Sequence, residues 1–592
     1  MTRRMLLGAA TAVAPSLPRL FGAPAAPAAP AVNAFSRRYR LTIDRVRGKG
    51  IPEYSRKLVL ADAIPEAGRR FTEFSGDVSG RYIGALASVA ADRKEEFPEL
   101  RPLVAELIGL QKPQGYFGAS FPAEGVSKQD MALLWGNGRL LIGLLEYARQ
   151  SHDAQALATA KKLGDFVVRI APELNSEKTR AQFESGAFAM GYICWTQIIE
   201  GMVELHRVTG TPRYRSVAEE MARRTERRPS EHSHGFLTSL RGVVDLYEAT
   251  GDRAFLDRAE GEWKGVIESG NLLTPGSIPE AWKPKAHRTE GCAEADWLRL
   301  SLRLWGLTGK TQYLEQAERT LFNEFAMNQF DTGDFGHRVV SRTGSPLGGT
   351  DEGGGTARAW WCCTLHGLRA FPDVRAHIFR AQGDRLSYDL PMEGTGEAGG
   401  CRFVAESALE SAALVRIAVQ EASAKAVPLM IRKPSWTQAV RLTVNGAPLT
   451  AEIQGGYHGI RRTWKVGDQV EIRYDMRPRV ERVDGDAQVT LWHGPWLLGI
   501  DEMRNPSFFD EPMNSNRLTV PVLPDGSAEL QRDGAPAAGP FSVAQARFRV
   551  SYLPGGYPMS PGTAMLSPVA EQTGFRSSAW EYTFQLAGSR AK

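Results

Sequence analysis

Three stretches of the sequence share one pattern: TGTPRYRSVAE at 209–219, TGDRAFLDRAE at 250–260 and TGKTQYLEQAE at 308–318. Each begins with Thr-Gly and continues with an aromatic residue and an Ala-Glu pair at fixed spacing. Apolar residues at helical spacing precede each stretch and form one face of a helix. Glycine suits the left-handed conformation that ends a helix, so Thr-Gly predicts a helix end followed by a second helix running back. The repeated unit is therefore a helical hairpin.

The spacing of the hairpins bears on how they assemble. Repeated hairpins build either an open solenoid or a closed α/α toroid. The copies are unevenly spaced, and long inserts such as 270–288 and 332–359 interrupt them. Inserts of this length, gathered on one face, favour a toroid whose site is built from loops. We predict a closed α/α toroid over residues 32–383.

The hydrophobic period changes from 3.6 to 2 near residue 384. Val440, Leu442 and Val444 alternate with polar residues and end at Asn445-Gly446, which predicts a hairpin turn. Similar alternation later in the chain predicts antiparallel β-sandwich modules, one at 384–500 and a second at 501–592. The predicted fold class is multidomain α+β, with the toroid first and the β-sandwiches after it.

The first residues read as an export signal. Arg3 and Arg4 precede a weakly apolar run, and Ala- and Pro-rich residues with Ala-x-Ala cleavage options follow. We predict a twin-arginine signal peptide at 1–31, because the apolar run is too short to span a bilayer. The mature protein is expected to be soluble and periplasmic or secreted.

Composition narrows the class of partner. The formal net charge of +5 is small for 592 residues, and no basic stripe with interleaved aromatics is present, so we expect no nucleic-acid partner. No later stretch reaches membrane-spanning length, so we expect no membrane partner after export. The 13 Trp and 15 Tyr suit a sugar-binding protein and equally a large core. Nothing in the sequence indicates an oligomeric state.

Two short stretches gather thiols and carboxylates: RTEGCAE at 288–294 and WWCCTLH at 360–366. Each stands at the predicted start of a helix, where the helix dipole favours thiolates. Three thiolates and a carboxylate suit tetrahedral Zn²⁺. Cysteine is also among the residues most often buried in cores, so the two stretches alone leave a plain packing role open.

Glu290-x-Cys292 followed by Cys362-Cys363, within a helical-repeat domain, resembles the β-L-arabinofuranosidases of glycoside hydrolase family 127, in the six-hairpin glycosidase superfamily. The resemblance spans most of the chain, since 428–446, 489–498 and 566–573 also resemble that family's sandwich modules. It implies an (α/α)6 catalytic domain followed by β-sandwiches. It also implies a retaining glycoside hydrolase that removes a terminal sugar, β-L-arabinofuranose or a related one, from glycans.

The resemblance assigns roles to the thiol stretches. It implies that Glu290, Cys292, Cys362 and Cys363 bind Zn²⁺ and that Cys362 is the nucleophile, which forms a thioglycosyl intermediate. A plain thioglycoside hydrolyses slowly, and zinc on the sulfur would stabilise the departing thiolate.

A carboxylic acid must also protonate the leaving oxygen and then activate water. The best match to the family is Glu280, in IPEAW at 278–282, although a glutamate there also fits a surface loop. Glu294 and Glu352 are the reserve candidates.

The resemblance further implies histidines that hold the sugar, and here the sequence departs from it. Arg81 and Asn137 stand near two of the expected imidazoles, and these changes bear on the identity of the sugar. His234 is the closest match to the third, where a structural helix cap is the plain alternative. Trp361, beside the nucleophile, completes the expected substrate contacts.

Two other classes of function remain open at this point. One is a non-catalytic glycan-binding protein with a structural zinc site, which a missing acid/base would favour. The other is a lyase or epimerase, because α/α toroids also host those chemistries and a fold does not fix a function. Those enzymes use His, Tyr or Arg on the sugar and need no adjacent pair of cysteines.

Overall fold

The structure is a computed structural model of the whole chain. It describes residues 34–587 apart from 51–52, 65–68, 283–287, 340–357, 484–487, 511–514, 535–540, 556–559 and 573–579. The predicted signal peptide at 1–31 lies outside the described residues, as does Glu352. Within the described residues, no helix is both long enough and apolar enough to cross a membrane.

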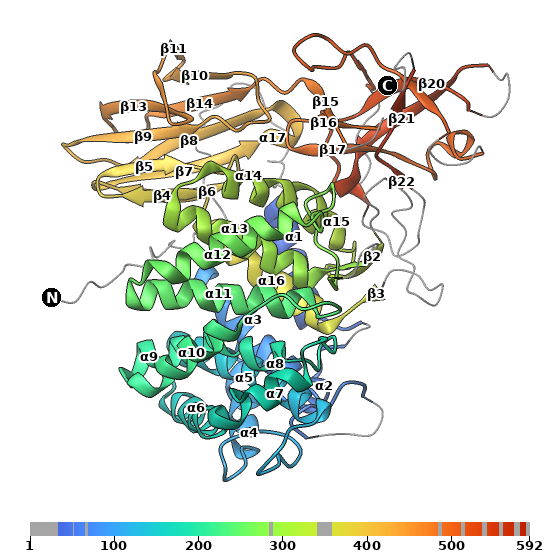
Figure 1. Cartoon of the computed structure of the whole chain (residues 1–592). Helices are drawn as coiled ribbons and strands as arrows, with labels where there is room; N and C mark the ends of the chain where they lie inside the picture. The colour runs from blue at the N-terminus through green and yellow to red at the C-terminus, as the bar shows by residue number, and fades with distance from the viewer. Residues whose placement is uncertain are drawn as a thin grey trace.

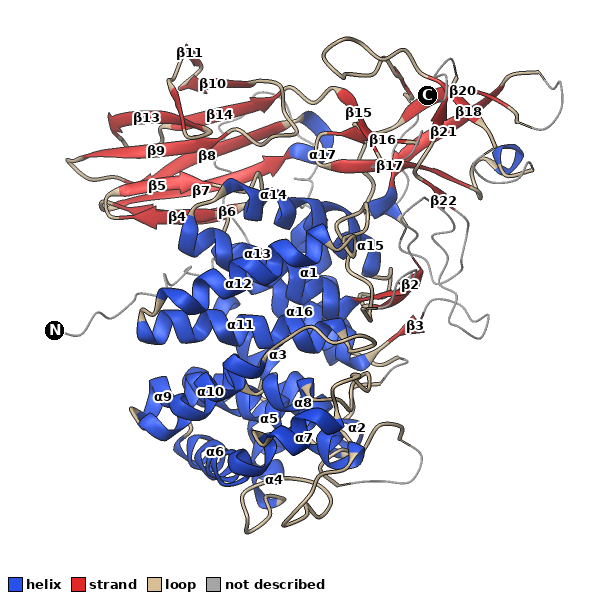
Figure 2. Cartoon of the chain, in the orientation of Figure 1, coloured by secondary structure: helices blue, strands red, loops and turns tan. Residues whose placement is uncertain are grey.

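The first part of the chain is helical (Figures 1 and 2). Its helices are α1 (Ala34–Arg47), α2 (Arg56–Leu60), α3 (Asp77–Arg93), α4 (Leu100–Gly109), α5 (Lys128–Ser151), α6 (Ala154–Leu174), α7 (Glu177–Gln182), α8 (Ile193–Thr196), α9 (Ile199–Thr209), α10 (Pro212–Arg224), α11 (Ser233–Thr250), α12 (Arg253–Glu268), α13 (Gly291–Thr308), α14 (Thr311–Arg319), the π-helix η1 (Thr320–Phe325), α15 (Ala326–Asn328) and α16 (Trp361–Ala376).

The predicted helical hairpins are confirmed. Gly210, Gly251 and Gly309 cap α9, α11 and α13, each in the left-handed region with φ of 66°, 73° and 67°. Each glycine N–H donates to a carbonyl in the last turn of its helix, which satisfies an acceptor that the helix end leaves free. The chain then turns back into α10, α12 and α14.

The hairpins close into a ring. Contacts run from α3 to α5, α9, α11, α13 and α16, and from α16 back to α3. An outer helix packs on each inner one: α4 on α3, α6 on α5, α10 on α9, α12 on α11, α14 on α13 and α1 on α16. This closed double ring is the predicted α/α toroid, and its first helix, α1, packs on its last, α16.

The strands follow the helices, apart from a small sheet of β1 (Arg288–Glu290), β2 (Gly336–Val339) and β3 (Arg358–Ala359). The other strands are β4 (Phe379–Gln382), β5 (Arg385–Tyr388), β6 (Gly394–Ala398), β7 (Cys401–Ala408), β8 (Leu414–Glu421), β9 (Ala426–Arg432), β10 (Val440–Val444), β11 (Ala447–Leu449), β12 (Ile453–Gln454), β13 (Tyr457–Thr463), β14 (Gln469–Tyr474), β15 (Pro478–Arg482), β16 (Val489–His493), β17 (Trp496–Asp501), β18 (Arg517–Thr519), β19 (Gln531–Arg532), β20 (Phe548–Leu553), β21 (Gly562–Pro568), β22 (Trp580–Glu581) and β23 (Gln585–Leu586). Short helices α17 (Leu409–Ala412), η2 (Pro506–Phe508) and η3 (Val569–Glu571) lie among them.

The strands form two regions. The first is a sandwich of two sheets, β11-β10-β14-β8-β7-β6 and β12-β13-β9-β5-β4. Its β10–β11 hairpin turns at Asn445-Gly446, both with positive φ, as the sequence predicts. The second region is one sheet, β15-β16-β17-β21-β20-β18-β23, with β19 and β22 attached. The boundary predicted at 500 differs from this arrangement, because β15 to β17 pair with the C-terminal strands.

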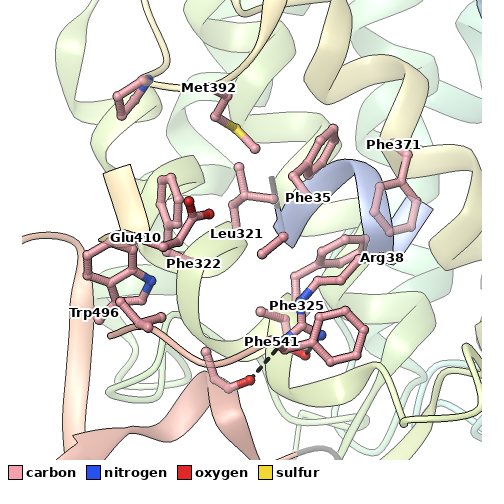
Figure 3. Close-up of a pocket in the computed structure, with 15 residues that line it drawn as sticks. Phe35, Arg38, Leu321, Phe322, Phe325, Phe371, Met392, Glu410, Trp496 and Phe541 are labelled. Atoms are coloured by element: carbon pink, nitrogen blue, oxygen red, sulfur yellow. Dashed lines mark hydrogen bonds between the residues drawn. The ribbon is translucent and has the colours of Figure 1, made fainter. Parts of the chain in front are cut away.

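The toroid and the strand regions meet over an apolar pocket (Figure 3). Phe35, Leu321 and Phe371 of the toroid line it together with Met392 and Trp496 of the strand regions. Arg38 fastens this junction, because its guanidinium donates to the carbonyls of Ala326, at 2.7 Å, and Ala570, at 2.9 Å. Figure 2 shows that both strand regions lie on one side of the toroid.

Candidate active site

The two thiol stretches begin two neighbouring inner helices. Glu290 ends β1 and is the N-cap of α13, which places Cys292 in the first turn. Trp360 is the N-cap of α16, which places Cys362 and Cys363 in its first turn. Gly291 permits the close approach, because a Cβ there would lie 3.1 Å from the Cβ of Cys363 and 2.8 Å from that of Phe335.

The thiol cluster, Glu290, Cys292, Cys362 and Cys363, has the spacing of a metal site. The Sγ atoms of Cys292 and Cys363 are 3.8 Å apart, and those of Cys362 and Cys363 are 3.9 Å apart. Glu290 Oε2 lies 3.9 Å from Cys363 Sγ. Sulfur ligands about 2.3 Å from a tetrahedral metal are about 3.8 Å apart, so the residues fit a thiophilic cation. The structure thus brings the predicted ligands together.

Cys362 differs from the other members of the cluster. It is half-buried, whereas Cys292, Cys363 and Glu290 are almost completely buried. Hydrogen bonds from Cys292 and Cys363, with the charge of Arg81, hold the pKa of the Cys362 thiol well below its ordinary value. Burial raises the pKa of the thiols of Cys292 and Cys363. Of the three thiols, Cys362 combines thiolate character with access to a ligand.

Glu280 lies at the cluster. Its carboxylate is ion-paired with Arg288, and its Oε1 lies 3.5 Å from His337 Nε2. The side chain is 8% exposed and approaches the carboxylate of Glu290 and the imidazole of His232. Glu280 is therefore a buried carboxyl group held next to Glu290 of the thiol cluster.

The reserve candidate Glu294 lies in a different environment. It is fully buried in the first turn of α13. Burial and the nearby charge of Glu324 raise the pKa of its carboxyl well above the ordinary value, which keeps it protonated. The donor atoms of Glu280, Glu290 and His232 lie within 4.8 Å of one another, and among the described residues Glu294 belongs to no such group.

Two histidines that are not among the predicted site residues lie at the cluster; of the pair His232 and His234, the sequence favoured His234. His232 Nε2 lies 3.3 Å from Glu290 Oε1, and its ring stacks on Phe188 at 4.6 Å. His337 Nε2 lies 3.8 Å from Glu290 Oε2, because β1 pairs with β2 and puts Glu290 opposite His337. Burial lowers the pKa of His232 to about 3, so its imidazole is neutral. Burial also lowers that of His337, but a hydrogen bond to Glu290 and the charge of Glu280 outweigh it and raise the pKa.

His234 takes a different place from the one predicted. It is 1% exposed, its Nδ1 lies 2.6 Å from Asp296, and its Nε2 accepts hydrogen bonds from Arg81 at 3.0 Å and Arg139 at 3.1 Å. Both ring nitrogens are therefore used inside the protein. The prediction of a sugar contact is corrected here, because His234 lies beneath the cluster and His232 lies beside it.

The remaining predicted contacts divide in the same way. Arg81 is buried with its Nη1 3.6 Å from Cys292 Sγ, so it belongs to the cluster's underside. The amide of Asn137 accepts from Phe117 N and donates to backbone carbonyls including that of Ser75, which leaves no polar atom for a ligand. The prediction for Asn137 is therefore corrected to a structural role. Trp361, half-buried, adjoins Cys362 at the start of α16.

Two sequence models of one protein family match this chain. The sequence model described as β-L-arabinofuranosidase, GH127 catalytic domain, matches residues 41–376, and that of the GH127 middle domain matches 395–476. A search of curated proteins finds no match.

Solved structures share the fold at low sequence identity. A GH127 β-L-arabinofuranosidase from Geobacillus stearothermophilus T6 is 16% identical with a TM-score of 0.70, over 94% of this chain and 99% of that one. A second GH127 β-arabinofuranosidase is 15% identical with a TM-score of 0.70, over 94% of both chains. A third structure, titled glycoside hydrolase, is 17% identical with a TM-score of 0.64, over 88% of this chain and 95% of that one.

Proposed function

Because the chain belongs to glycoside hydrolase family 127, we propose that it is a zinc-dependent retaining glycosidase with Cys362 as its nucleophile. The proposed substrate is a glycan that carries terminal β-L-arabinofuranose or a related sugar. One observation carries the proposal: the half-buried thiol of Cys362 stands in a cluster of metal-ligand spacing, and the buried carboxyl group of Glu280 approaches Glu290 of the same cluster.

Zn²⁺ is the cation we propose for the cluster. Glu290, Cys292, Cys362 and Cys363 would hold it, and three sulfurs with one oxygen suit its tetrahedral preference. When bound, zinc would supply positive charge that keeps the sulfurs as thiolates and makes the nucleophile's sulfur a better leaving group.

The residues can carry out two displacements. In the first, the Cys362 thiolate attacks the anomeric carbon while Glu280 gives its proton to the glycosidic oxygen, and the aglycone alcohol departs. In the second, the Glu280 carboxylate takes a proton from water, whose oxygen attacks the same carbon, and the carbon–sulfur bond breaks to restore the thiolate. Two inversions at one carbon give net retention.

Neighbouring side chains hold Glu280 in position for both steps. Arg288 contacts Oε2 and His337 faces Oε1, so the carboxyl group has a fixed orientation. His337 also approaches Glu290, which couples the acid/base to a proposed zinc ligand. We propose His232, beside Glu290, and Trp361, next to Cys362 in the sequence, as sugar contacts.

We also propose that the protein acts outside the cytoplasm after twin-arginine export. The support is the Arg3-Arg4 pair ahead of the apolar run, together with cysteines that are all free in the structure. Cell fractionation of the full chain and of an Arg3→Lys, Arg4→Lys variant tests this, since only the former should reach the periplasm or medium.

The decisive experiment joins metal analysis to labelling of the nucleophile. Purified protein is analysed for metals, then treated with cysteine-directed furanosyl and pyranosyl inhibitors and digested for peptide mass spectrometry. About one zinc per chain and a glycosyl adduct on Cys362 are expected. Cys401→Ser, which changes a buried thiol of β7, is the matched control and should keep both.

Two outcomes would contradict the proposal. Hydrolysis with inversion of the anomeric centre would exclude a covalent intermediate on Cys362. Bound zinc with neither hydrolysis nor adduct across the panel would favour a glycan-binding protein with a structural metal.

A further inference from the structure

A second recess lies between the toroid and the first sandwich, at the far end of α13 from the thiol cluster. Its volume is about 340 Å³, which is in the range of small-molecule sites, and it is partly open to solvent. Gly309, in the turn before α14, forms its toroid wall. The other lining residues come from β4, β5, β9 and the β12–β13 hairpin: Arg380, Gln382, Arg385, Ser387, Met430, Gln454, Gly455 and Tyr457. We call it the junction groove.

Arg380 presents prepared hydrogen-bond donors in the junction groove. Its guanidinium lies 4.3 Å over the ring of Trp305, and its Nε lies 3.4 Å from Asp389 Oδ2. A Cβ on Gly309 would lie 3.7 Å from Nη1, so this end of the side chain reaches the toroid wall. Within the part of the chain that the structure describes, the two terminal nitrogens donate no hydrogen bond to protein. The guanidinium is thus held in place while its outer edge is available.

The carboxylate behind Arg380 is already occupied. Asp389 is 1% exposed, its Oδ1 accepts a hydrogen bond from Tyr457 at 2.7 Å, and its Oδ2 accepts one from Ser387 at 3.1 Å. Its backbone carbonyl accepts another from Arg432. Asp389 therefore anchors the groove's wall and does not face a ligand.

The lining of the junction groove is positively charged. Arg385 adds a second, exposed guanidinium that contacts the side-chain oxygen of Gln382, and no carboxylate lines the groove among the described residues. Guanidinium groups bind carboxylates with two parallel hydrogen bonds. Gln454 and the ring of Tyr457 add an amide and an apolar face of the kind that sugar rings contact. Gly455 and Gly456 leave the rim without side chains.

We propose that the junction groove binds an acidic saccharide, a sugar unit bearing a carboxylate within a glycan chain. The role of the groove, to anchor a polymeric substrate, rests on the proposed function. The binding itself is independent of hydrolysis. Cys292 stands in the first turn of α13 and Gly309 caps its other end, so a helix of 18 residues, about 27 Å long, separates the two sites. A chain long enough to span them would raise the effective concentration of its end at Cys362.

The test measures binding to the full-length, metal-loaded protein by titration calorimetry. The probes are a galacturonate oligosaccharide, a neutral arabinose oligosaccharide of equal length, and inorganic sulfate. The acidic oligosaccharide should bind, and the Arg380→Gln, Arg385→Gln double variant should bind it at least about tenfold more weakly. Arg441→Gln, an exposed arginine of the same sandwich, is the matched control and should bind as the parent does.

The single variant Arg385→Gln guards against misfolding, because Arg385 is exposed whereas Arg380 packs on Trp305. It should weaken binding without changing the thermal unfolding midpoint. The inference is overturned if the acidic oligosaccharide does not bind, if the double variant binds equally well, or if the neutral oligosaccharide or sulfate binds as tightly. Hydrolysis of a small aryl furanoside, measured in parallel, should be unchanged in every variant. Its absence from the parent protein would count against the proposed function and not against the groove.

Discussion

The thiol cluster and the group directly beneath it both gather residue types that can bind a metal, but at different spacing. In the cluster, Cys363 Sγ lies 3.8–3.9 Å from the donor atoms of Cys292, Cys362 and Glu290. Beneath it, Asp296 receives His234 at 2.6 Å and His366 at 2.7 Å, with Arg241 bound to the same carboxylate. Two histidines and an aspartate can bind a metal by composition, but here both oxygens of Asp296 are already hydrogen-bonded to the two imidazoles. Separation of the donor atoms, more than residue type, distinguishes a site from a core.

The largest expected effect concerns the thiol cluster. Cys362→Ser should lower kcat by roughly 10³-fold or more, because the proposed nucleophile is removed. The free energy of unfolding of the zinc-loaded protein should change far less than kcat, since Cys362 is half-buried. Steady-state kinetics and denaturant unfolding check both parts. Retention of more than a tenth of the parent kcat would remove Cys362 from the mechanism.

The next largest effect concerns the buried group around Asp296. Asp296→Asn should lower the free energy of unfolding by about 3–5 kcal/mol, because Arg241 would lose one of its buried carboxylate partners and His234 its acceptor. Urea unfolding measures it. The matched control is Asp373→Asn, whose carboxylate is 40% exposed and pairs with Arg299, and it should cost about 1 kcal/mol or less. Equal costs for the two variants would deny the buried group its structural role.

Arg81 connects the thiol cluster to the buried group around Asp296. Its guanidinium joins His234 at 3.0 Å to Cys292 Sγ at 3.6 Å, so it offsets negative charge where three thiolates would bind zinc. Arg81→Lys keeps the charge but cannot make both contacts, and its zinc affinity should fall about tenfold. Competition with a chromogenic chelator measures this. An unchanged affinity would show that the contact with Cys292 does not support the metal.

The smallest effect separates the two neighbouring histidines. His232→Gln should lower kcat/KM by about tenfold with little change in stability, because His232 lies beside Glu290 at the edge of the site. His234→Gln should instead lower the unfolding midpoint, because its imidazole joins Asp296 to two buried arginines. Kinetics and thermal unfolding on both variants decide the matter, and the opposite pattern would restore the sequence prediction for His234.

Local signals in the sequence were sufficient for much of the fold. Thr-Gly pairs ended helices at Gly210, Gly251 and Gly309, and Asn445-Gly446 turned a hairpin, because backbone conformation at these positions depends on the residues themselves. The C-terminal sheet was divided wrongly, since β17 pairs with β21 and β22, strands far along the chain whose alternation does not reveal their partner.

Local signals in the sequence also predicted part of the site. Adjacent thiols at a helix start are a local signal, and the cluster forms from them. His337 was missed because only the pairing of β1 with β2 places it opposite Glu290, and no residue pattern near it records that pairing. His232 and His234 are two positions apart, and the start of α11 decides that one ring faces Glu290 and the other Asp296.

The ring is closed by its own ends, and this sets an order of events during synthesis. Helix α1 packs on α16, so the chain must be made as far as Ala376 before either can find its partner. The thiols of α13 and α16 meet only at the same moment, since they belong to the last two members of the inner ring. A nascent chain therefore cannot complete the proposed metal site until almost two thirds of it has left the ribosome, and loading of the proposed cation would be a late, post-assembly event.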